Sequence, residues 1–518
     1  MSGLVLTTCH RRLAPALVAV ALLATACTED PVPPASGDPD GTSLVIAVAD
    51  EPAELNPLDG YAEHGAAKIF EGLVEHDADS SLRPALAVEL PEPSSDGRTW
   101  TVKLRPGVRF TDGTPLEAQD VVATYRGMLD PARHSPVRQR FAMLKAVTAL
   151  DPSTVEFTLT APYAPFPDLL VLGILPGESL SGPGSPEPVG TGPYELTEWR
   201  RGMHLELAAN KDYWDGPPAI KKVTVEFIRD DETRAERLRA GKLDGAALPP
   251  PLAAEFDNDD GMRVVSHSAA DVRAVVLPTD DPVTGDPAVR LALNNAVNRD
   301  QLVEDVLAGQ GSSAHTPMPE VLAEFVEPGA AFDHDITRAL DQLESSGWVT
   351  GPDGIRAKGG KDAKFTLRHL SGDTVSAGLA KAFATNARSI GIQVDLEPVS
   401  ATALTGATVV GFGNPFDPDL ALYEVLRSGR GSLGGYVNET VDAALDIGRS
   451  ATDPAQRATA YRRLQRAFVT APGLVVLADP NHTYVIRESW DGYEPVVDAA
   501  GPSMSWGAWW NLEKWTPR

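Results

Sequence analysis

The sequence is nearly free of cysteine, and this absence excludes several classes of protein. Only two cysteines, Cys9 and Cys27, occur among its 518 residues. A disulfide framework, a CxxC redox pair and a thiolate zinc site all need cysteines within the folded part of a chain. None of the three is therefore possible in the region that follows Cys27.

Motifs of catalysis and nucleotide binding are also missing. The ten histidines form no HExxH motif and no i,i+4 pair, so we predict no metal site built from histidine. No GxxxxGK[ST] loop is present, and the run 177–181, GESLS, misses the GxSxG nucleophile motif at its last position. We predict that the protein is not an enzyme and needs no cofactor, and we keep a secreted hydrolase as a remote alternative.

Basic residues are few relative to acidic ones, 45 against 72, which gives a formal net charge of −27. A field of this sign repels nucleic acids and favours neutral or cationic ligands at long range. Because salt screens such a field within about 8–10 Å, a purely solubilising role for the acidity is an equal alternative. The balance predicts no nucleic-acid partner.

The first 26 residues carry no acidic side chain and are typical of a leader. His10-Arg11-Arg12 precede an apolar, alanine-rich run from Leu13 to Ala26, which is shorter than the roughly 20 residues that span a bilayer. A basic flank followed by a short apolar core and small residues indicates a secretory signal peptide. We predict a signal peptide over residues 1–26 and a tether rich in proline, glycine and aspartate over residues 27–42.

The remaining chain alternates between strand and helix patterns. A length of 518 residues predicts two or three domains, and the alternation indicates an α/β fold. Asp286, Asn298 and Asp453 are expected to cap helices that begin at the next residue. Strands are expected at 43–49, 154–159, 365–370, 392–399 and 474–477, and helices at 66–74, from Phe141, at 232–240, from 299 to Gly309, and at 340–348.

The stretch from Thr99 to Val122 carries the strongest local signal. Alternating apolar residues predict strand structure up to Phe110, and Asp112-Gly113 predicts a turn. Thr114 is the expected N-cap of the helix that follows, with Pro115 at its first position and Glu117 as the capping-box partner. Any buried strand-turn-helix unit has these features, so the physics alone does not choose a family.

The run from Leu104 to Val122, LRPGVRFTDGTPLEAQDVV, resembles the signature of the family 5 extracytoplasmic solute-binding proteins of ABC importers, the peptide- and nickel-binding group. Further matches to that family are PVGTGPY at 188–194, NKDYW at 210–214 and the helix 340–348. The resemblance covers nearly everything from about residue 43 to residue 518. The boundary LATAC, which ends at Cys27, also resembles a bacterial lipobox.

The resemblance implies a periplasmic-binding-protein-like α/β fold with two lobes, a hinge and an extra α/β subdomain in the first lobe. It divides the chain into lobe I (43–60, 189–272 and 479–518), a subdomain (61–188) and lobe II (273–478). It further implies a monomer, lipid-anchored through Cys27 to the outer face of the cell membrane or periplasmic. That protein would bind a peptide or other small solute and deliver it to a separate ABC permease and ATPase.

We predict that the solute contacts the stretch 411–419, GFGNPFDPD. Two aromatic rings, an amide and two carboxylates stand in a loop that turns too often for a core strand, which is typical of a cleft wall. The candidates are Phe412, Asn414, Phe416, Asp417 and Asp419. The alternative is an ordinary Asp-Pro turn with packed phenylalanines.

Asn414 stands where dipeptide-binding members of the family place an aspartate for the peptide's amino terminus. An amide supplies no charge, so a nickel-chelate or other small-solute binder of the same family is the alternative to a peptide binder. Further candidates for contact with the solute are Tyr61, His64, His482, Tyr484 and Trp506, and for Trp506 the alternative is a place in the core.

Overall fold

A computed structural model describes residues 41–181, 188–259, 261–429, 431–501 and 503–518. The chain divides into two units, Met1–Pro34 and Ala35–Arg518, and all described residues belong to the second. The predicted signal peptide, the lipidation site Cys27 and the tether up to residue 40 lie outside the described residues. Among those described, no helix is long and apolar enough to cross a membrane.

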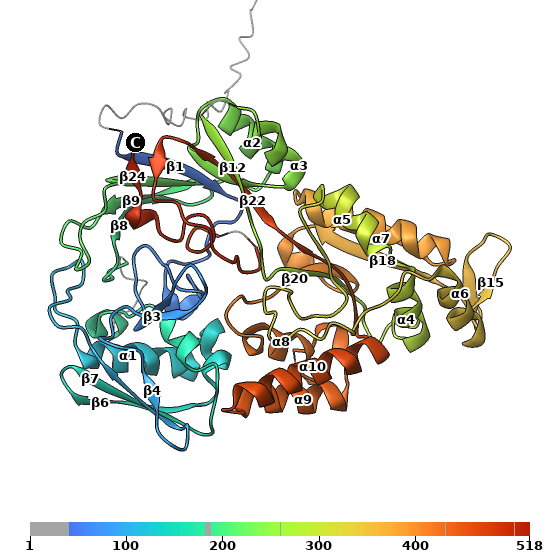
Figure 1. The fold of residues 1–518 in the computed structure, drawn as a ribbon, viewed down its shortest axis with the longest axis horizontal. Coiled ribbons are helices and arrows are strands. Elements are labelled where there is room, and N and C mark those ends of the chain that lie inside the picture. The colour runs from blue at the N-terminus through green and yellow to red at the C-terminus, as the bar shows by residue number, and fades with distance from the viewer. Residues whose placement is uncertain (1–40, 182–187, 260, 430, 502) are drawn as a thin grey trace, which may run out of the picture. The chain divides into compact units, whose positions relative to one another are not determined.

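A seven-stranded sheet, in the order β12-β22-β11-β1-β10-β9-β8, forms what we call the first lobe (Figure 1). β1 lies parallel to both β10 and β11. α2 (Asp231–Arg239) follows β10, and α3 (Pro250–Ala253) follows β11. The strands are β1 (Ser43–Val48), β8 (Tyr194–Arg200), β9 (His204–Ala209), β10 (Lys222–Phe227), β11 (Gly245–Leu248), β12 (Met262–His267) and β22 (His482–Arg487).

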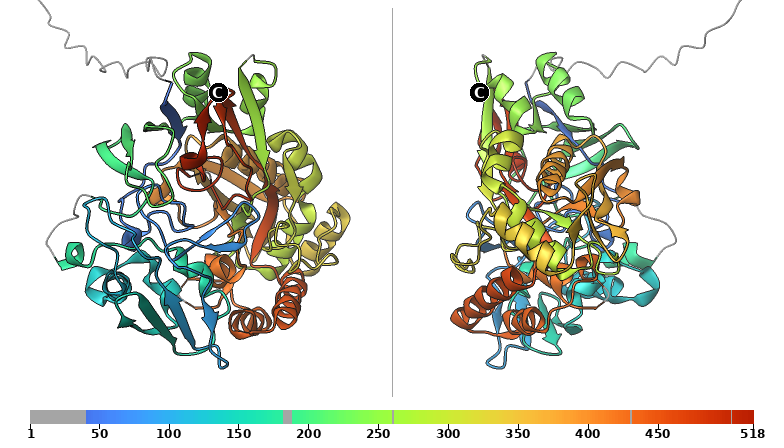
Figure 2. Two further views of the ribbon diagram at one scale, coloured as in Figure 1. Left: turned by 60° about the vertical axis from the view of Figure 1, so that its left-hand side comes forward. Right: turned by 90° about the vertical axis from the view of Figure 1, so that its right-hand side faces the viewer.

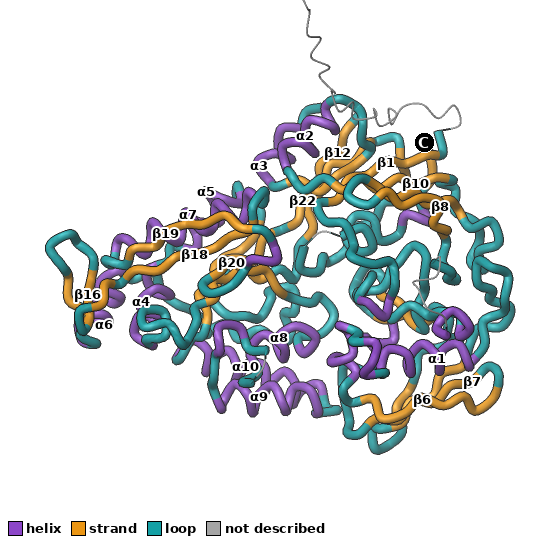
Figure 3. Tube along the Cα trace, turned by 180° about the vertical axis from the view of Figure 1, so that it is seen from behind, coloured by secondary structure: helices purple, strands orange, loops and turns teal. Residues whose placement is uncertain are grey.

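A six-stranded sheet, in the order β14-β21-β13-β20-β18-β19, forms the second lobe. Its strands are β13 (Val272–Val276), β14 (Gly311–Ser313), β18 (Lys364–Leu370), β19 (Gln393–Val399), β20 (Thr408–Phe412) and β21 (Leu474–Pro480). Its helices are α4 (Pro287–Ala296), α5 (Arg299–Leu307), α6 (Ile336–Ser345), α7 (Thr374–Ser389), α8 (Asp419–Leu426), α9 (Glu439–Ser450) and α10 (Pro454–Thr470). Figure 3 shows α7 lying along β18 and β19, and α5 packs against β14 and β21. A small sheet is added by β15 (Val349–Thr350), β16 (Arg356–Lys358) and β17 (Lys361–Asp362).

The subdomain is built on a four-stranded sheet, β4-β5-β7-β6, against which α1 (Ala118–Leu129) packs. Tyr125 of α1 meets Phe157 of the sheet edge-on, with ring centroids 5.0 Å apart. Figure 2 shows the subdomain beside the helices α9 and α10. The strands are β4 (Glu92–Pro93), β5 (Thr99–Lys103), β6 (Leu144–Asp151) and β7 (Thr154–Leu159), and the pairs β2 (Val74–His76) with β3 (Leu82–Pro84) and β23 (Trp490–Asp491) with β24 (Thr516–Pro517) lie outside the larger sheets.

The chain passes between the seven- and six-stranded sheets twice, from β12 to β13 and from β21 to β22. We call these two short stretches, residues 268–271 and residue 481, the crossing segments. They connect the lobes and therefore mark the hinge of the fold. The lobe boundaries drawn from the resemblance remain predictions.

Three of the four predicted helix caps are confirmed. Asp286 accepts a hydrogen bond from Ala288 N, Asn298 from Gln301 N, and Asp453 from Ala455 N, each through its side chain. Such bonds satisfy backbone donors that have no partner inside the helix. The helix capped by Asn298 ends at Leu307, two residues before the predicted Gly309.

The helix predicted to start after Thr114 begins later, at Ala118, with Glu117 as its N-cap. The Thr114 hydroxyl donates to Asp112 Oδ1 (2.6 Å) in the preceding turn, and Leu116 N donates to Val108 O (3.0 Å). The prediction was wrong by one turn because the Asp112 side chain offers Thr114 a local partner that competes with a cap.

Two other predicted helices are wrong. Residues 66–73 form no helix, because their backbone bonds to distant segments: Leu73 N donates to Leu170 O (2.8 Å), and Gly192 N donates to Ile69 O (2.9 Å). A Cβ on Gly72 would lie 2.5 Å from the Val171 backbone, so the close approach depends on glycine. After Phe141 the chain forms β6, which pairs with β7.

Candidate functional site

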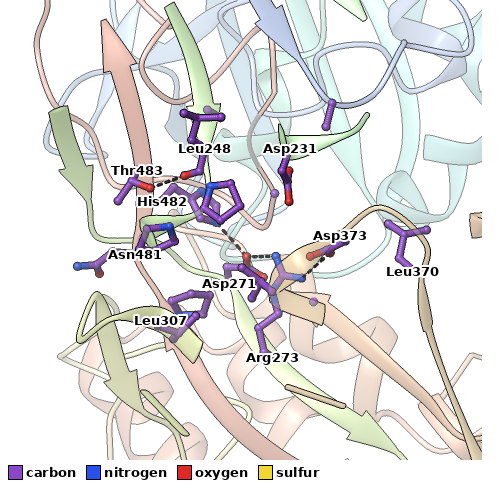
Figure 4. Close-up of a pocket in the computed structure, with 18 of the residues that line it drawn as sticks. Asp231, Leu248, Asp271, Arg273, Leu307, Leu370, Asp373, Asn481, His482 and Thr483 are labelled. Atoms are coloured by element: carbon purple, nitrogen blue, oxygen red, sulfur yellow. Dashed lines mark hydrogen bonds and ion pairs between the residues drawn. The ribbon is translucent and has the colours of Figure 1, made fainter. Parts of the chain in front are cut away.

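A cavity of about 300 Å³ lies between the two lobes. The carboxyl ends of β1, β10 and β11 line it from the first lobe, and the turn from β18 to α7 lines it from the second. Figure 4 shows a charged group formed by Asp271, Arg273, Asp373 and His482, with Leu248, Leu307 and Leu370 on different sides of it. Further charged residues of the lining are Asp50, Arg229, Asp231 and Arg234. A concave site that combines apolar surface with convergent polar groups is typical of solute binding.

Arg273 provides the cavity with a fixed guanidinium group. Its Nη2 donates to Asp271 Oδ2 (2.6 Å), and its Nη1 lies 3.8 Å from Asp373 Oδ2. Burial alone would raise the pKa of Asp271, but the charges of Arg273 and His482 lower it to about 2. Asp271 and Arg273 are therefore both charged at physiological pH.

His482 stands between two carboxylates. Its Nε2 lies 2.9 Å from Asp271 Oδ2 and its Nδ1 lies 3.0 Å from Asp498 Oδ2. An ionised carboxylate only accepts, so both ring nitrogens donate and the ring is an imidazolium. Burial would lower the pKa of His482, but the bonds to Asp271 and Asp498 raise it to about 9.

Gly411 of β20 lies opposite Arg273 of β13 in the second sheet. A Cβ at this position would lie 2.6 Å from Asp271 Oδ1 and 3.1 Å from Arg273 Nε. Glycine therefore leaves the room that the Asp271–Arg273 pair occupies. The same residue lines the cavity.

A second contact between the lobes is aromatic. Phe416, in the loop before α8, stacks on His76 with ring centroids 3.3 Å apart and an interplanar angle of 4°. Trp506 meets Phe416 edge-on at 5.1 Å, and His64 lies 6.1 Å from it. His76 Nε2 lies 3.1 Å from Asp168 Oδ1, which holds that ring in place. Three predicted solute contacts, Phe416, His64 and Trp506, are thus brought together.

The polar residues of the stretch 411–419 are bonded within the protein. Asn414 Oδ1 accepts from Phe416 N (2.9 Å) and Asp417 N (3.1 Å). Asp417 is paired with Arg457 at 2.6 Å, and Asp419 with Arg449 at 3.0 Å. Asp419 also accepts from Tyr163 OH of the subdomain (2.9 Å).

The other predicted residues lie outside this aromatic contact, and two of them, His482 and Tyr484, share Asp498 as a partner. Phe412 is the last residue of β20 and belongs to the core of the second lobe, so the expectation that residues 411–412 form a loop is wrong. Tyr61 meets Phe70 edge-on at 6.3 Å, and the Tyr484 hydroxyl donates to Asp498. Of the ten predicted contacts, His482 alone lines the cavity, and whether any of them touches a solute remains a prediction.

Sequence reasoning missed Asp271, Arg273 and Asp373. The signals were a carboxylate and a guanidinium two residues apart at the start of β13, and an acidic N-cap directly after β18. Neither signal stands out in the sequence by itself. The site forms only in the folded protein, where the crossing segments meet the ends of the strands.

Comparison with known proteins assigns the family. The model of "Bacterial extracellular solute-binding proteins, family 5 Middle" matches residues 81–431. The chain belongs to family 5. This family 5 chain is 44% identical over 499 residues to Protein XP55 of Streptomyces lividans, covering 93% of this chain and 92% of that protein.

Solved structures of family 5 proteins share the fold. NikZ from Campylobacter jejuni, in complex with Ni(L-His), superposes with a TM-score of 0.86 at 27% identity, over 92% of this chain and 100% of NikZ. The oligopeptide-binding protein AppA from Bacillus subtilis, in complex with a nonapeptide, gives a TM-score of 0.82 at 25% identity, over 92% of this chain and 99% of AppA. The periplasmic-binding-protein-like fold is thereby confirmed, and this family 5 protein is an extracytoplasmic solute-binding protein of the ABC-importer type.

Proposed function

We propose that this family 5 protein captures a short, zwitterionic, peptide-like solute between its lobes and delivers it to a separate membrane permease and ATPase. The observation that carries the proposal is the cavity at the hinge, where Arg273 and His482 supply positive charge, Asp373 supplies a carboxylate, and leucine side chains supply apolar surface on several sides. A free peptide has the matching groups, namely a carboxylate, an ammonium group and an apolar body.

The cavity size supports a short solute. Its volume of about 300 Å³ stands at the lower end of the roughly 300–1,000 Å³ of small-molecule sites. A long peptide would have to extend beyond this cavity towards the aromatic contact at Phe416. We therefore expect peptides of two or three residues to bind better than long ones.

Contacts between the lobes support capture by closure about the hinge. Thr374 of α7 donates two hydrogen bonds to the Asp231 carboxylate of α2, one from its hydroxyl (2.8 Å) and one from its backbone N (3.2 Å). Tyr163 of the subdomain donates to Asp419 of the second lobe. These bonds exist only while the lobes are together, so each one favours the closed form.

The second candidate function is the binding of a metal chelate instead of a peptide. The likeness to NikZ favours it, as does the aromatic contact of Phe416 with His76 and Trp506. In this alternative the stacked rings, rather than the charged cavity, would hold the solute.

Native mass spectrometry of the purified protein, followed by denaturation and identification of what it releases, tests the proposal. A set of short peptides is the expected result. A chelated metal would favour the second candidate, and a bound compound returned chemically altered would indicate an enzyme.

We also propose that Cys27 carries a lipid that anchors the protein to the outer face of the membrane. The resemblance of LATAC to a lipobox and the tether that follows it support this anchor. Cys27→Ala should move the protein from the membrane to the soluble fraction, while the matched control Cys9→Ala should not. Membrane attachment of the Cys27→Ala protein would place the anchor elsewhere.

A further inference from the structure

We propose that His482 is a positioning residue of the solute site: held between Asp271 and Asp498, it joins the two crossing segments and fixes the Arg273 guanidinium at the cavity, where this group takes the carboxylate of the solute. The inference rests on the proposed function and adds to it the groups that hold the solute's anionic end. It concerns His482 as a support of Arg273, not as a contact of the solute.

The first step is the place of His482 in the chain. It is the first residue of β22, directly after one crossing segment, and its partner Asp271 ends the other. The bond between Nε2 and Asp271 Oδ2 (2.9 Å) therefore ties the only two connections between the seven- and six-stranded sheets among the described residues. Both side chains are buried.

The second step is the sharing of one oxygen atom. Asp271 Oδ2 accepts from His482 Nε2 at 2.9 Å and from Arg273 Nη2 at 2.6 Å. On the other side of this pair stands Gly411, where even a Cβ would lie only 3.1 Å from the guanidinium carbon of Arg273. Loss of the imidazolium would leave the buried carboxylate with Arg273 as its only cation and free its oxygen to move.

The third step is the surroundings of Asp498, which anchors His482 from the first lobe. Its Oδ1 lies 2.8 Å from His267 Nδ1, its Oδ2 lies 3.0 Å from His482 Nδ1, and it accepts from the Tyr484 hydroxyl. Four further groups face this network. The Tyr493 hydroxyl lies 2.5 Å from His267 Nε2, and the Arg263 guanidinium lies 4.7 Å from the centre of the Tyr493 ring. The other two are Asp373, near Arg273, and Asp479 of β21.

The charges of the bonded pair Asp271 and His482 remain constant over a wide pH range. Asp271 is ionised above a pKa of about 2, and His482 is protonated below a pKa of about 9. Arg273 and His482 balance Asp271 and Asp498. Solute affinity that depends on the network should thus be insensitive to its titration between pH 5 and 7, where the termini of a peptide also keep their charges.

Two variants should introduce pH dependence of opposite sign. In His482→Gln, Asp271 and Asp498 lose their shared cation and burial raises the pKa of Asp271, so this carboxyl takes up a proton as the pH falls. In Asp498→Asn, His482 loses one of its two carboxylates, so its pKa falls and the ring loses its proton as the pH rises. Affinity should fall towards pH 5 in the first variant and towards pH 7 in the second.

The experiment is isothermal titration calorimetry of the full chain with di- and tripeptides at pH 5, 6 and 7. We expect each variant to bind roughly tenfold or more weakly at its unfavourable pH, because one buried charge lacks its partner. His134→Gln, at an exposed histidine of the subdomain, is the matched control and should bind like the wild type. Burial raises the pKa of Asp479 to about 8. Because Asp479 is present in the wild type and in every variant, its own titration is compared out by expressing each affinity relative to the wild type at the same pH.

Nitrogen NMR of the wild type supplies a test without solute, in which the His482 ring should stay doubly protonated up to pH 8. Weakening of both variants by the same factor at every pH would reduce His482 to a purely structural role and overturn the inference. If His482→Gln does not fold, Asp498→Asn, which preserves the shape of the side chain, carries the test.

The outcomes for the two proposals can be told apart. A wild type that binds no peptide would overturn the proposed function, and with it this inference. Peptide binding by the wild type without the opposite pH dependences of the two variants would overturn the inference alone.

Discussion

The two contacts that join the lobes beside the candidate site differ in kind. At the hinge, Arg273, Asp271 and His482 form a network of charged hydrogen bonds. Around Phe416, aromatic rings meet face to face and edge to face. Charged hydrogen bonds demand fixed geometry and complementary charge, whereas stacked rings tolerate many partners. The hinge end is thus suited to recognising the solute's charged terminus, and the aromatic end to completing closure around it.

Replacement of the guanidinium should have the largest effect on binding. Arg273→Ala removes one of the cations that line the cavity and leaves Asp271 with one partner fewer, so we expect peptide affinity to fall by about 2–5 kcal/mol. Calorimetry on the variant measures the loss. Arg368→Ala, which removes an exposed arginine paired with Glu397, is the matched control. Equal affinity of both variants would show that the hinge cavity is not where the solute's carboxylate binds.

Removal of the stacked ring should have the next largest effect. Phe416→Ala loses the contacts with His76, His64 and Trp506, and we expect binding to weaken by about 1–3 kcal/mol. Leu150→Ala, at a side chain that is 56% exposed, is the control. If Phe416→Ala costs more than Arg273→Ala, the aromatic contact rather than the charged cavity holds the solute, as in the metal-chelate alternative.

The bond from the subdomain should contribute less. Tyr163→Phe removes the hydroxyl that donates to Asp419 (2.9 Å), while Arg449 continues to neutralise this carboxylate. We expect the closed form to lose about 1 kcal/mol. Small-angle scattering with saturating solute would report a larger fraction of open molecules. An unchanged curve and affinity would mean that the subdomain takes no part in closure.

The smallest effect is expected from Thr374→Val. This change removes the hydroxyl that donates to Asp231 and keeps the branched shape and the backbone N–H, which also bonds to Asp231. We expect a loss of about 0.5–1 kcal/mol in solute affinity, measured by calorimetry. The control is Thr385→Val, because the Thr385 hydroxyl bonds within its own helix. A larger loss for the control would exclude a role for Asp231 in closure.

Features that depend on neighbours in sequence were predictable. The caps at Asp286, Asn298 and Asp453 use backbone donors two or three residues away, and β1, β7 and β18 follow from alternating or continuous apolar runs. The signature stretch assigned the family because its strand, turn and helix are encoded together. Its exact cap was mispredicted because Asp112 and Glu117 offer competing local bonds.

Features that depend on distant partners were not predictable. Residues 66–73 have a helical pattern, yet their backbone bonds are completed by segments about a hundred residues later. Asp271, Arg273, Asp373 and His482 come from three separate parts of the chain, and nothing local distinguishes them from other charged residues. Asn414 was noted as unusual from sequence, but its use in bonding Phe416 N and Asp417 N required coordinates.

The glycine at position 411 has a consequence for protein engineering. No side chain fits there without displacing the Asp271–Arg273 pair, and that pair is tied to the hinge through His482. A designer who wants a different cargo therefore has the apolar lining residues to work with, among them Leu248, Leu307 and Leu370, which lie on different sides of the cavity. Changes of size and shape at these positions should retune selectivity while the charged group, and the hinge it supports, stay as they are.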